Sequence, residues 1–159
     1  MILRQAGAQD ADDIARITNH IIADTLITFT TTLRAPGDIA RDIADRGHAF
    51  LVLEADGRAE GFATYGPFRS GPGYAATCEL SIQLSAKIRG QGGGRMVLDR
   101  LMEVARADGK HVMVAGISGA NAPAVAFHAA VGFTETGRMP QVGRKQGQWL
   151  DLILMQKIL

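Results

Sequence analysis

Four glycines within five residues, at Gly90 and 92–94, constrain this chain more than any other feature. They follow an apolar stretch at Thr77–Leu84 and precede a segment whose apolar residues recur at helical spacing: Met96, Val97, Leu101, Val104 and Ala105. Glycines let the backbone reach positive φ, so successive N–H groups can converge on an anion without a Cβ in the way. The start of a helix adds partial positive charge. Arg89–Gly94 therefore predicts a strand–loop–helix unit that binds phosphate; the alternative is a tight connection that binds nothing.

Two well-known phosphate loops do not match this segment. A P-loop ends in Gly-Lys-Ser/Thr, whereas Gly94 is followed by Arg95 and Met96. A dinucleotide fingerprint needs a glycine where this chain has Arg95 or Val97. Nucleotide hydrolysis and dinucleotide redox chemistry are therefore not expected.

Composition limits the partners and the compartment. The 17 Lys and Arg residues nearly balance the 16 Asp and Glu residues, which gives no reason to expect binding to nucleic acid or to an anionic membrane. The single cysteine, Cys78, excludes an internal disulfide and favours a reducing compartment. Residues 1–5 lack the features of a signal peptide, and no run approaches the ~18 apolar residues of a membrane span. We expect a cytoplasmic protein, and we expect no metal.

Hydrophobic periodicity and turn residues predict one α/β domain over residues 1–159, with the element order β-α-α-β-β-β-α-β-α-β-β. Asp10 is expected to cap the first helix, and Asp56-Gly57 to form a hairpin turn. Residues 25–32 are expected to form a loop or a frayed helix end. The expected strands are 2–4, 49–54, 60–65, 77–84, 111–115, 133–137 and 149–156, and the expected helices are 10–21, 36–46, 95–108 and 121–131.

Two motifs together resemble the GNAT acyltransferase superfamily. The first is Arg89-x-x-Gly92-x-Gly94 between a strand and a helix. The second is Asn121-x-x-Ala124-x-x-Phe127-His128-x-x-x-Gly132-Phe133. The C-terminal segment Val142–Leu152, together with Tyr65-Gly66-x-Phe68-Arg69 and Gly137–Gly143, narrows the resemblance to phosphinothricin and methionine sulfoximine/sulfone acetyltransferases. The resemblance implies a mostly antiparallel mixed sheet flanked by helices, with a splayed central strand pair, and a homodimer.

Acetyl-CoA is the co-substrate that the resemblance implies. The phosphate loop would bind its pyrophosphate through Arg89, Gly90, Gln91, Gly92, Gly93, Gly94 and Arg95. Backbone groups near Ile82, Gln83 and Leu84 would pair with the pantetheine arm on the splayed strand. Asn121 would hydrogen-bond the same arm, and it is also a natural helix N-cap.

Glu79 and His128 are the expected catalytic residues. Glu79 lies on a strand that is otherwise apolar, where desolvation would raise the pKa of its carboxyl and suit a general base. The residues alone slightly favour an exposed or salt-bridged glutamate, and the resemblance shifts the interpretation to a base that acts directly or through water. His128 occupies a position where many superfamily members have a tyrosine that protonates the thiolate, and water is the alternative donor. Cys78 is expected to be an inert core residue.

The acceptor site is expected around the Gly/Pro-rich segment Gly66–Gly73, between the strands expected at 60–65 and 77–84. Arg69 has the bidentate geometry that suits an α-carboxylate, although a solvated loop arginine is the commoner case. The resemblance places further contacts at Ser70, Gly71, Glu79, Leu80 and Ser81, and Phe29 and Tyr74 are weaker candidates for the pocket wall. Polyamine and aminoglycoside acceptors would need an acidic site, so Arg69 weighs against them.

Three departures from the family pattern concern the acceptor. The segment Cys78-Glu79-Leu80-Ser81 keeps the glutamate and the serine but differs in the residues around them. Gln83 stands where the resembled subfamily usually has tyrosine. The segment Thr28-Phe29-Thr30-Thr31 lacks the Trp-Asn/Glu pair that is often found near this point. We expect acetyl transfer to the amino group of a small amino-acid-like acceptor of the phosphinothricin or methionine sulfoximine/sulfone type. Acetylation of another amine or of a protein N-terminus is one alternative, and a catalytically silent acyl-CoA-binding module is another.

Overall fold

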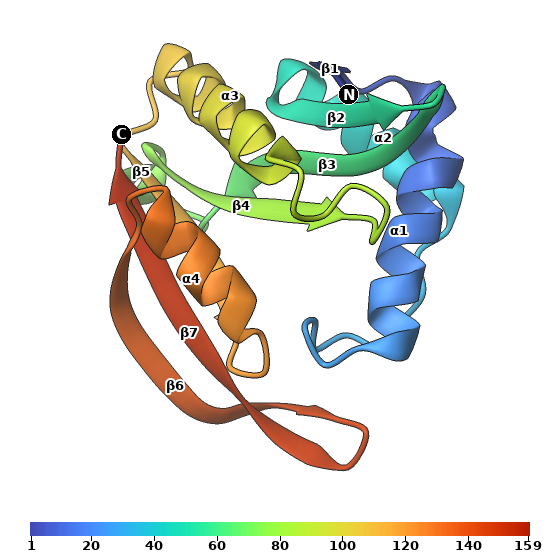
Figure 1. The fold of residues 1–159 in the computed structure, drawn as a ribbon. Coiled ribbons are helices and arrows are strands. Elements are labelled where there is room, and N and C mark those ends of the chain that lie inside the picture. The colour runs from blue at the N-terminus through green and yellow to red at the C-terminus, as the bar shows by residue number, and fades with distance from the viewer.

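The computed structural model describes all residues, 1–159, and consists of one seven-stranded sheet with two helices on each face (Figure 1). The strands lie in the order β1-β2-β3-β4-β5-β7-β6. Their bounds are β1 Ile2–Gln5, β2 Phe50–Ala55, β3 Arg58–Pro67, β4 Thr77–Leu84, β5 Val112–Ser118, β6 Thr134–Lys145 and β7 Gln148–Ile158. The helices are α1 Ala11–Asp24, α2 Pro36–Arg46, α3 Gly93–Ala107 and α4 Ala122–Ala130. No helix is both long and apolar enough to span a bilayer.

The sheet is antiparallel except at one central pair. β4 and β5 are parallel and share only three residue pairs, from Thr77↔Val112 to Glu79↔Val114. Beyond Glu79, β4 pairs only with β3, and β5 pairs only with β7. The two strands therefore diverge, as Figure 1 shows, and the expected splayed pair is present.

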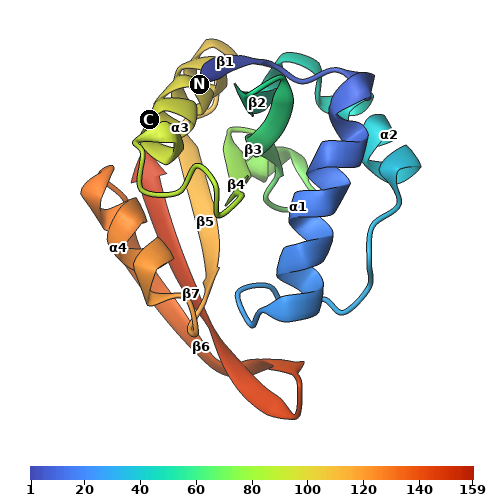
Figure 2. The ribbon, with the colours of Figure 1, turned by 45° about the vertical axis from the view of Figure 1, so that its right-hand side comes forward.

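Two apolar clusters hold the helices on opposite faces (Figure 2). The larger cluster packs α3 against the central strands through fully buried residues such as Val97, Leu98 and Leu101, and side chains of α4 pack at its edge. The smaller cluster packs α1 and α2 against β2 and β3 through residues such as Ile14 and Ile39. Alternate side chains of one strand reach opposite faces, so β4 contributes Cys78 and Leu80 to the larger cluster and turns Glu79, Ser81 and Gln83 to the face of α1 and α2.

The predicted element order is confirmed, and two local predictions need correction. Asp10 precedes α1 but does not cap it, because its carboxylate accepts hydrogen bonds from Arg4 (2.8 Å) and from the N–H of Gly7 (2.8 Å). The last two strands are also much longer than predicted. They form a hairpin closed by Gln146 (φ 50°) and Gly147 (φ 73°), and the hairpin extends away from the body of the molecule in Figure 1. Residues 25–32 are a loop, as expected.

Candidate active site

The gap between β4 and β5 exposes strand backbone at the centre of the sheet. Residues 80–84 of β4 are paired on one side only, with β3. Because consecutive residues of a strand direct their N–H and C=O groups to opposite sides, alternate residues of this segment leave theirs unpaired toward the gap. Such a free edge can bind an extended amide-containing ligand by strand-like hydrogen bonds. Of the residues predicted there, Ile82 and Leu84 direct their backbone groups toward the gap, whereas those of Gln83 face β3, as the bond from Ser85 N–H to Glu60 O shows.

The glycine-rich loop contains a row of N–H groups without a backbone acceptor. The first N–H of this region with a backbone acceptor is that of Met96, which donates to Gly92 O at 3.1 Å. The N–H groups of residues 89–95 have no such partner. Gly90 (φ 75°) and Gly92 (φ 82°) hold the positive φ that turns the chain, and the space where a Cβ would stand is empty at both. The loop therefore leads into the start of α3 as an anion-binding concavity, which fits a pyrophosphate.

The other two glycines of the loop are needed for packing. A Cβ on Gly93 would lie 2.8 Å from Met1 Sδ and 3.1 Å from Leu53 Cδ1. A Cβ on Gly94 would lie 3.3 Å from Leu84 Cδ1 and 3.4 Å from the Phe127 ring. The absence of side chains here lets α3 approach β2 and the end of β4 closely. The four glycines thus divide between backbone conformation and close packing.

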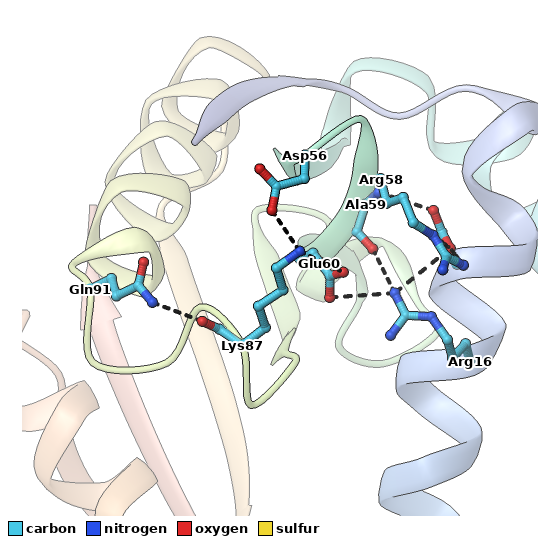
Figure 3. Close-up of polar contacts among 8 residues, drawn as sticks. Arg16, Asp56, Arg58, Ala59, Glu60, Lys87 and Gln91 are labelled. Atoms are coloured by element: carbon cyan, nitrogen blue, oxygen red, sulfur yellow. Dashed lines mark hydrogen bonds and ion pairs between the residues drawn. The ribbon is translucent and has the colours of Figure 1, made fainter.

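Ion pairs fix the loop to the β2–β3 hairpin (Figure 3). Lys87 Nζ lies 2.8 Å from Asp56 and 3.9 Å from the buried Glu60, and Gln91 Nε2 donates to Lys87 O at 2.7 Å. On the other side of Glu60, Arg16 of α1 lies 3.4 Å from its carboxylate. Lys87 is therefore engaged within the protein, and the loop is held in place by contacts on both sides of β3.

The charged side chains of the loop fold back onto the protein. Arg89 Nε donates to Leu84 O at 3.0 Å, at the end of β4. Arg95 lies 3.5 Å from both Asp99 and the carbonyl of Ala130. Both arginines are exposed. They remain predicted phosphate contacts, and the N–H groups without a backbone acceptor are the other candidates for binding an anion.

Glu79 is the last β4 residue paired with β5 and lies at the point where the strands separate. Its side chain leans over β5, where Oε1 lies 3.2 Å from the Cβ position of Gly116. It forms no ion pair or hydrogen bond with another residue. Partial desolvation raises the pKa of the Glu79 carboxyl. Of the two alternatives expected for Glu79, the structure shows an exposed side chain and no salt bridge.

His128 is buried (3 % exposed) between the rings of Phe127 and Phe133. Its Nδ1 donates to the carbonyl of Ala124 at 2.8 Å, so Nδ1 carries the hydrogen, and the buried Nε2 has no partner. Desolvation lowers the pKa of His128, although the bond to Ala124 opposes this. The imidazole is therefore neutral near pH 7, with an available lone pair on Nε2.

The predicted acceptor residues divide between the site and the core. Arg69, Ser70, Gly71 and Tyr74 are exposed in the β3–β4 connection, which joins β4 close to Glu79; the Arg69 guanidinium lies 5.4 Å from the centre of the Phe68 ring. Ser81 shares the face of Glu79. The prediction that the Leu80 side chain contacts the acceptor needs correction. This side chain is buried in the core beneath α3, so only the backbone of Leu80 can face an acceptor. Phe29 packs on the backbone of Gly143 and ties the loop after α1 to the C-terminal hairpin.

Two predicted cofactor side chains are engaged elsewhere. The Gln83 side chain lies on the face of α1, where Oε1 accepts a hydrogen bond from Thr18 Oγ1 at 2.8 Å. The Gln83 backbone does not face the gap either, because Ser85 N–H donates to Glu60 O and alternate residues of the strand share that direction, toward β3. The Asn121 side chain caps α4 by accepting from the N–H of Ala124 at 3.3 Å. Its amide N–H groups remain available.

A cavity of about 220 Å³ lies between the α1–α2 layer and the sheet, and the sequence did not predict it. Hydroxyl, amide and charged groups line one part of it, and apolar side chains line the rest. Its lining residues are Ile14, Thr18, Ile22, Thr28, Thr30, Arg34, Ile39, Asp42, Arg46, Phe50, Phe62, Thr64, Ser81 and Gln83. Because they come from α1, α2, the loop between them and the three strands β2, β3 and β4, no local pattern could have indicated them.

The structure offers neither a reactive cysteine nor a group of metal ligands. The Cys78 thiol is fully buried and lies 3.6 Å from Val112 O; burial raises its pKa to about 11, which opposes a nucleophilic role. No group of three or more His, Cys, Asp or Glu side chains is placed to hold a metal ion.

Comparisons with known proteins agree with this geometry. The model of the acetyltransferase (GNAT) family matches residues 15–133. An L-methionine sulfoximine/L-methionine sulfone acetyltransferase of Salmonella typhimurium is 41 % identical over 98 % of this chain and 93 % of its own length. The structure of a GNAT superfamily phosphinothricin acetyltransferase from Sinorhizobium meliloti in complex with acetyl-CoA is 32 % identical, with a TM-score of 0.93 over 99 % of this chain and 88 % of that one. That of a ribosomal-protein-alanine N-acetyltransferase from Brucella melitensis is 38 % identical, with a TM-score of 0.94 over the whole of both chains.

The family match covers most of the chain, and the free strand edge and the glycine loop fit acetyl-CoA. The chain therefore belongs to the GNAT family and is an acetyl-CoA-dependent N-acetyltransferase.

Proposed function

We propose that this enzyme acetylates the amino group of a small amino-acid-like acceptor, of the phosphinothricin or methionine sulfoximine/sulfone type, with Glu79 as general base. The observation that carries the proposal is the placement of Glu79, an unpaired carboxylate where β4 and β5 separate. The activities of the Salmonella and Sinorhizobium relatives support the choice of acceptor.

In this proposal, the glycine loop and the free strand edge bind acetyl-CoA, and the face of the sheet that carries Glu79 binds the acceptor. Acetyl-CoA supplies an acetyl group activated as a thioester. The N–H groups of residues 89–95 hold its pyrophosphate, and the free edge of residues 80–84 orients its amide arm. Arg89, Arg95 and the free amide of Asn121 add contacts along that path. The acceptor approaches from the face of Glu79, and Arg69 pairs with its carboxylate.

Glu79 removes a proton from the acceptor ammonium, directly or through one water. A carboxylate is a weak base in water, and its raised pKa brings it closer to the pKa of the group that it must deprotonate. The ionised form is the active one, so activity is expected to rise with pH through the raised pKa and then level off.

His128 is the proposed proton donor to the CoA sulfur, with water as the alternative. Its neutral Nδ1–H tautomer has no proton on Nε2, so it must accept a proton before it can donate one. The free lone pair of Nε2 is consistent with such a relay.

We also propose a homodimer in the cytoplasm. Exposed apolar side chains gather on the projecting hairpin: Met139, Val142 and Trp149 are each roughly half exposed. Side chains of this kind often mark an interface between subunits. The reduced state of the lone, buried Cys78 suits a reducing compartment.

The test is release of free thiol from acetyl-CoA in the presence of amino-acid analogues and of a peptide with an N-terminal alanine. Turnover of phosphinothricin or of methionine sulfone is expected. Turnover of the peptide alone would favour the protein N-terminus instead, and acetyl-CoA binding without any turnover would indicate a silent binding module.

The role of Glu79 is tested by the pH–rate profile of Glu79→Gln. The variant is expected to lose about 10²- to 10⁴-fold in kcat near pH 7, which is the usual contribution of a general base. Its loss should shrink as the pH rises, because the acceptor then arrives deprotonated. An unchanged rate would remove Glu79 from this role. The exposed Glu103→Gln on α3 is the matched control.

A further inference from the structure

Arg46 is the lining cation of the α1–α2 cavity that has no carboxylate partner. It is the last residue of α2 and is partly buried. Its Nη1 donates to Thr64 Oγ1 at 3.3 Å, and its guanidinium lies 3.4 Å from the Cβ position of Gly66. The other lining cation, Arg34, is paired with Asp42 at 2.9 Å. The lining thus carries two positive charges and one negative charge, a net of +1.

The sheet register relates the position of Arg46 to the strand of the proposed base. Thr64 lies opposite Ser81, and Gly66 lies opposite Glu79. Residues directly opposite on antiparallel strands project to the same face. Arg46 therefore lies over β3 residues whose partners on β4 are Ser81 and Glu79, while the Glu79 carboxylate itself leans over β5.

The hydrogen-bonding groups that line the cavity are rich in free donors. The Oε1 of Gln83 is occupied by Thr18, while its Nε2 has no partner. Ser81 Oγ also has no partner in the protein. Together with the guanidinium of Arg46, these groups suit an anionic group with several oxygens.

The size of the cavity and its distance from Glu79 fit the side chain of a small amino acid. Its volume of about 220 Å³ is roughly seven times the ~30 Å³ that a water molecule occupies in the liquid. Ser81 is two residues from Glu79 along β4, which is about 7 Å. This is comparable with the distance between the amino group and the terminal group of the side chain in an acceptor where two carbons separate Cα from that group.

Two of the departures from the family pattern lie in this cavity. Gln83 replaces the usual tyrosine, and Thr28 and Thr30 lie in the segment that lacks the usual tryptophan. All three side chains line the cavity, although they come from a strand and a loop. Smaller residues at these positions leave the space beside Arg46 open.

We propose that this cavity binds the side chain of the acceptor and that Arg46 selects acceptors whose side chain ends in an anion. The preferred acceptors are then amino acids with a second negative charge, such as a phosphinate or a carboxylate, over analogues with a neutral sulfone. This inference rests on the proposed function, since it assumes that the amine lies at Glu79.

The test compares kcat/KM for phosphinothricin and for methionine sulfone, two acceptors of similar length that differ in the charge of the side chain. Wild-type enzyme should prefer phosphinothricin. Arg46→Gln should lose about 10- to 100-fold of that preference, mainly through a higher KM for phosphinothricin, because a hydrogen bond to a charged group is lost. Arg46→Lys should recover part of it. Arg41→Gln, an exposed arginine on the same helix, is the matched control and should change neither acceptor.

The outcomes separate this inference from the proposed function. An equal or greater preference for methionine sulfone in wild-type enzyme, or a preference that Arg46→Gln leaves unchanged, overturns the role of Arg46 while acetylation of small acceptors stands. Calorimetric titration with phosphinothricin covers an enzyme that turns over neither acceptor. Binding that is weakened by Arg46→Gln then supports the cavity and contradicts the proposed function, and absence of binding overturns the inference.

Discussion

Replacing Gly92 by alanine tests whether the free N–H groups of the glycine loop hold acetyl-CoA. Gly92 has φ 82°, and the space where a Cβ would stand is empty, so the added methyl group meets no atom. The cost is backbone strain alone, about 1–2 kcal/mol for a non-glycine residue in the left-handed region. For a chain of this size that corresponds to a fall in Tm of about 2–8 °C.

The effect on the cofactor should be larger than the strain implies. Any relaxation of Gly92 toward negative φ turns the following N–H groups away from their common focus. Loss of one hydrogen bond to a charged phosphate costs roughly 1.5–3 kcal/mol, so the KM for acetyl-CoA should rise about 10- to 100-fold. The KM for the acceptor should change little. Steady-state kinetics with each substrate varied in turn measures both values.

Gly109→Ala is the matched control for this strain. Gly109 has φ 77°, also with no atom near its Cβ position, but it follows the far end of α3. Both variants should lose similar stability in thermal unfolding, and only Gly92→Ala should weaken acetyl-CoA binding. An unchanged KM in Gly92→Ala, or an equal rise in both variants, would refute the assignment of the loop to the pyrophosphate.

Two further predictions concern stability. Leu101→Ala should lower the free energy of unfolding by about 2–5 kcal/mol in chemical denaturation, because Leu101 is fully buried on the sheet-facing side of α3. Met96→Ala on the exposed side of the same helix should change it by less than about 1 kcal/mol. His128 has a folded-state pKa below its ordinary value of 6.5, so the unfolded chain binds the proton more tightly and stability should fall as the pH drops from about 6.5 toward the lowered pKa. His128→Leu should therefore lose less Tm between pH 7 and pH 5 than wild type does; an equal loss in both proteins would show that other groups cause the acid sensitivity.

Local patterns in the sequence determined most of the fold and indicated a phosphate-binding loop, and the resemblance of two motifs to the GNAT superfamily indicated the cofactor. Asp56 and Gly57 adopt the positive φ values of a tight hairpin turn because few residue pairs tolerate them, and the sequence predicts this directly. The positive φ of Gly90 and Gly92 is of the same kind. Helical and strand periodicities predict the element order for the same reason, since each depends on residues that are close together in the chain.

The tertiary structure decided which side chains share a surface. The sequence predicts Asp10 as a helix cap, but in the folded protein its carboxylate pairs with Arg4. The sequence also predicts Leu80 as a substrate contact, but the pleat of β4 directs its side chain into the core beneath α3. β4 and β5 separate after Glu79 and Val114, where their pairing ends. That point depends on both strands together, so no single segment of the sequence predicts it. Arg46 gave no signal in the sequence because its place beside Thr64 exists only after α2 docks on the sheet. The chain's local chemistry thus indicated a phosphate site, the family resemblance of its motifs indicated acetyl-CoA, and long-range packing assembled the groups proposed to face the acceptor.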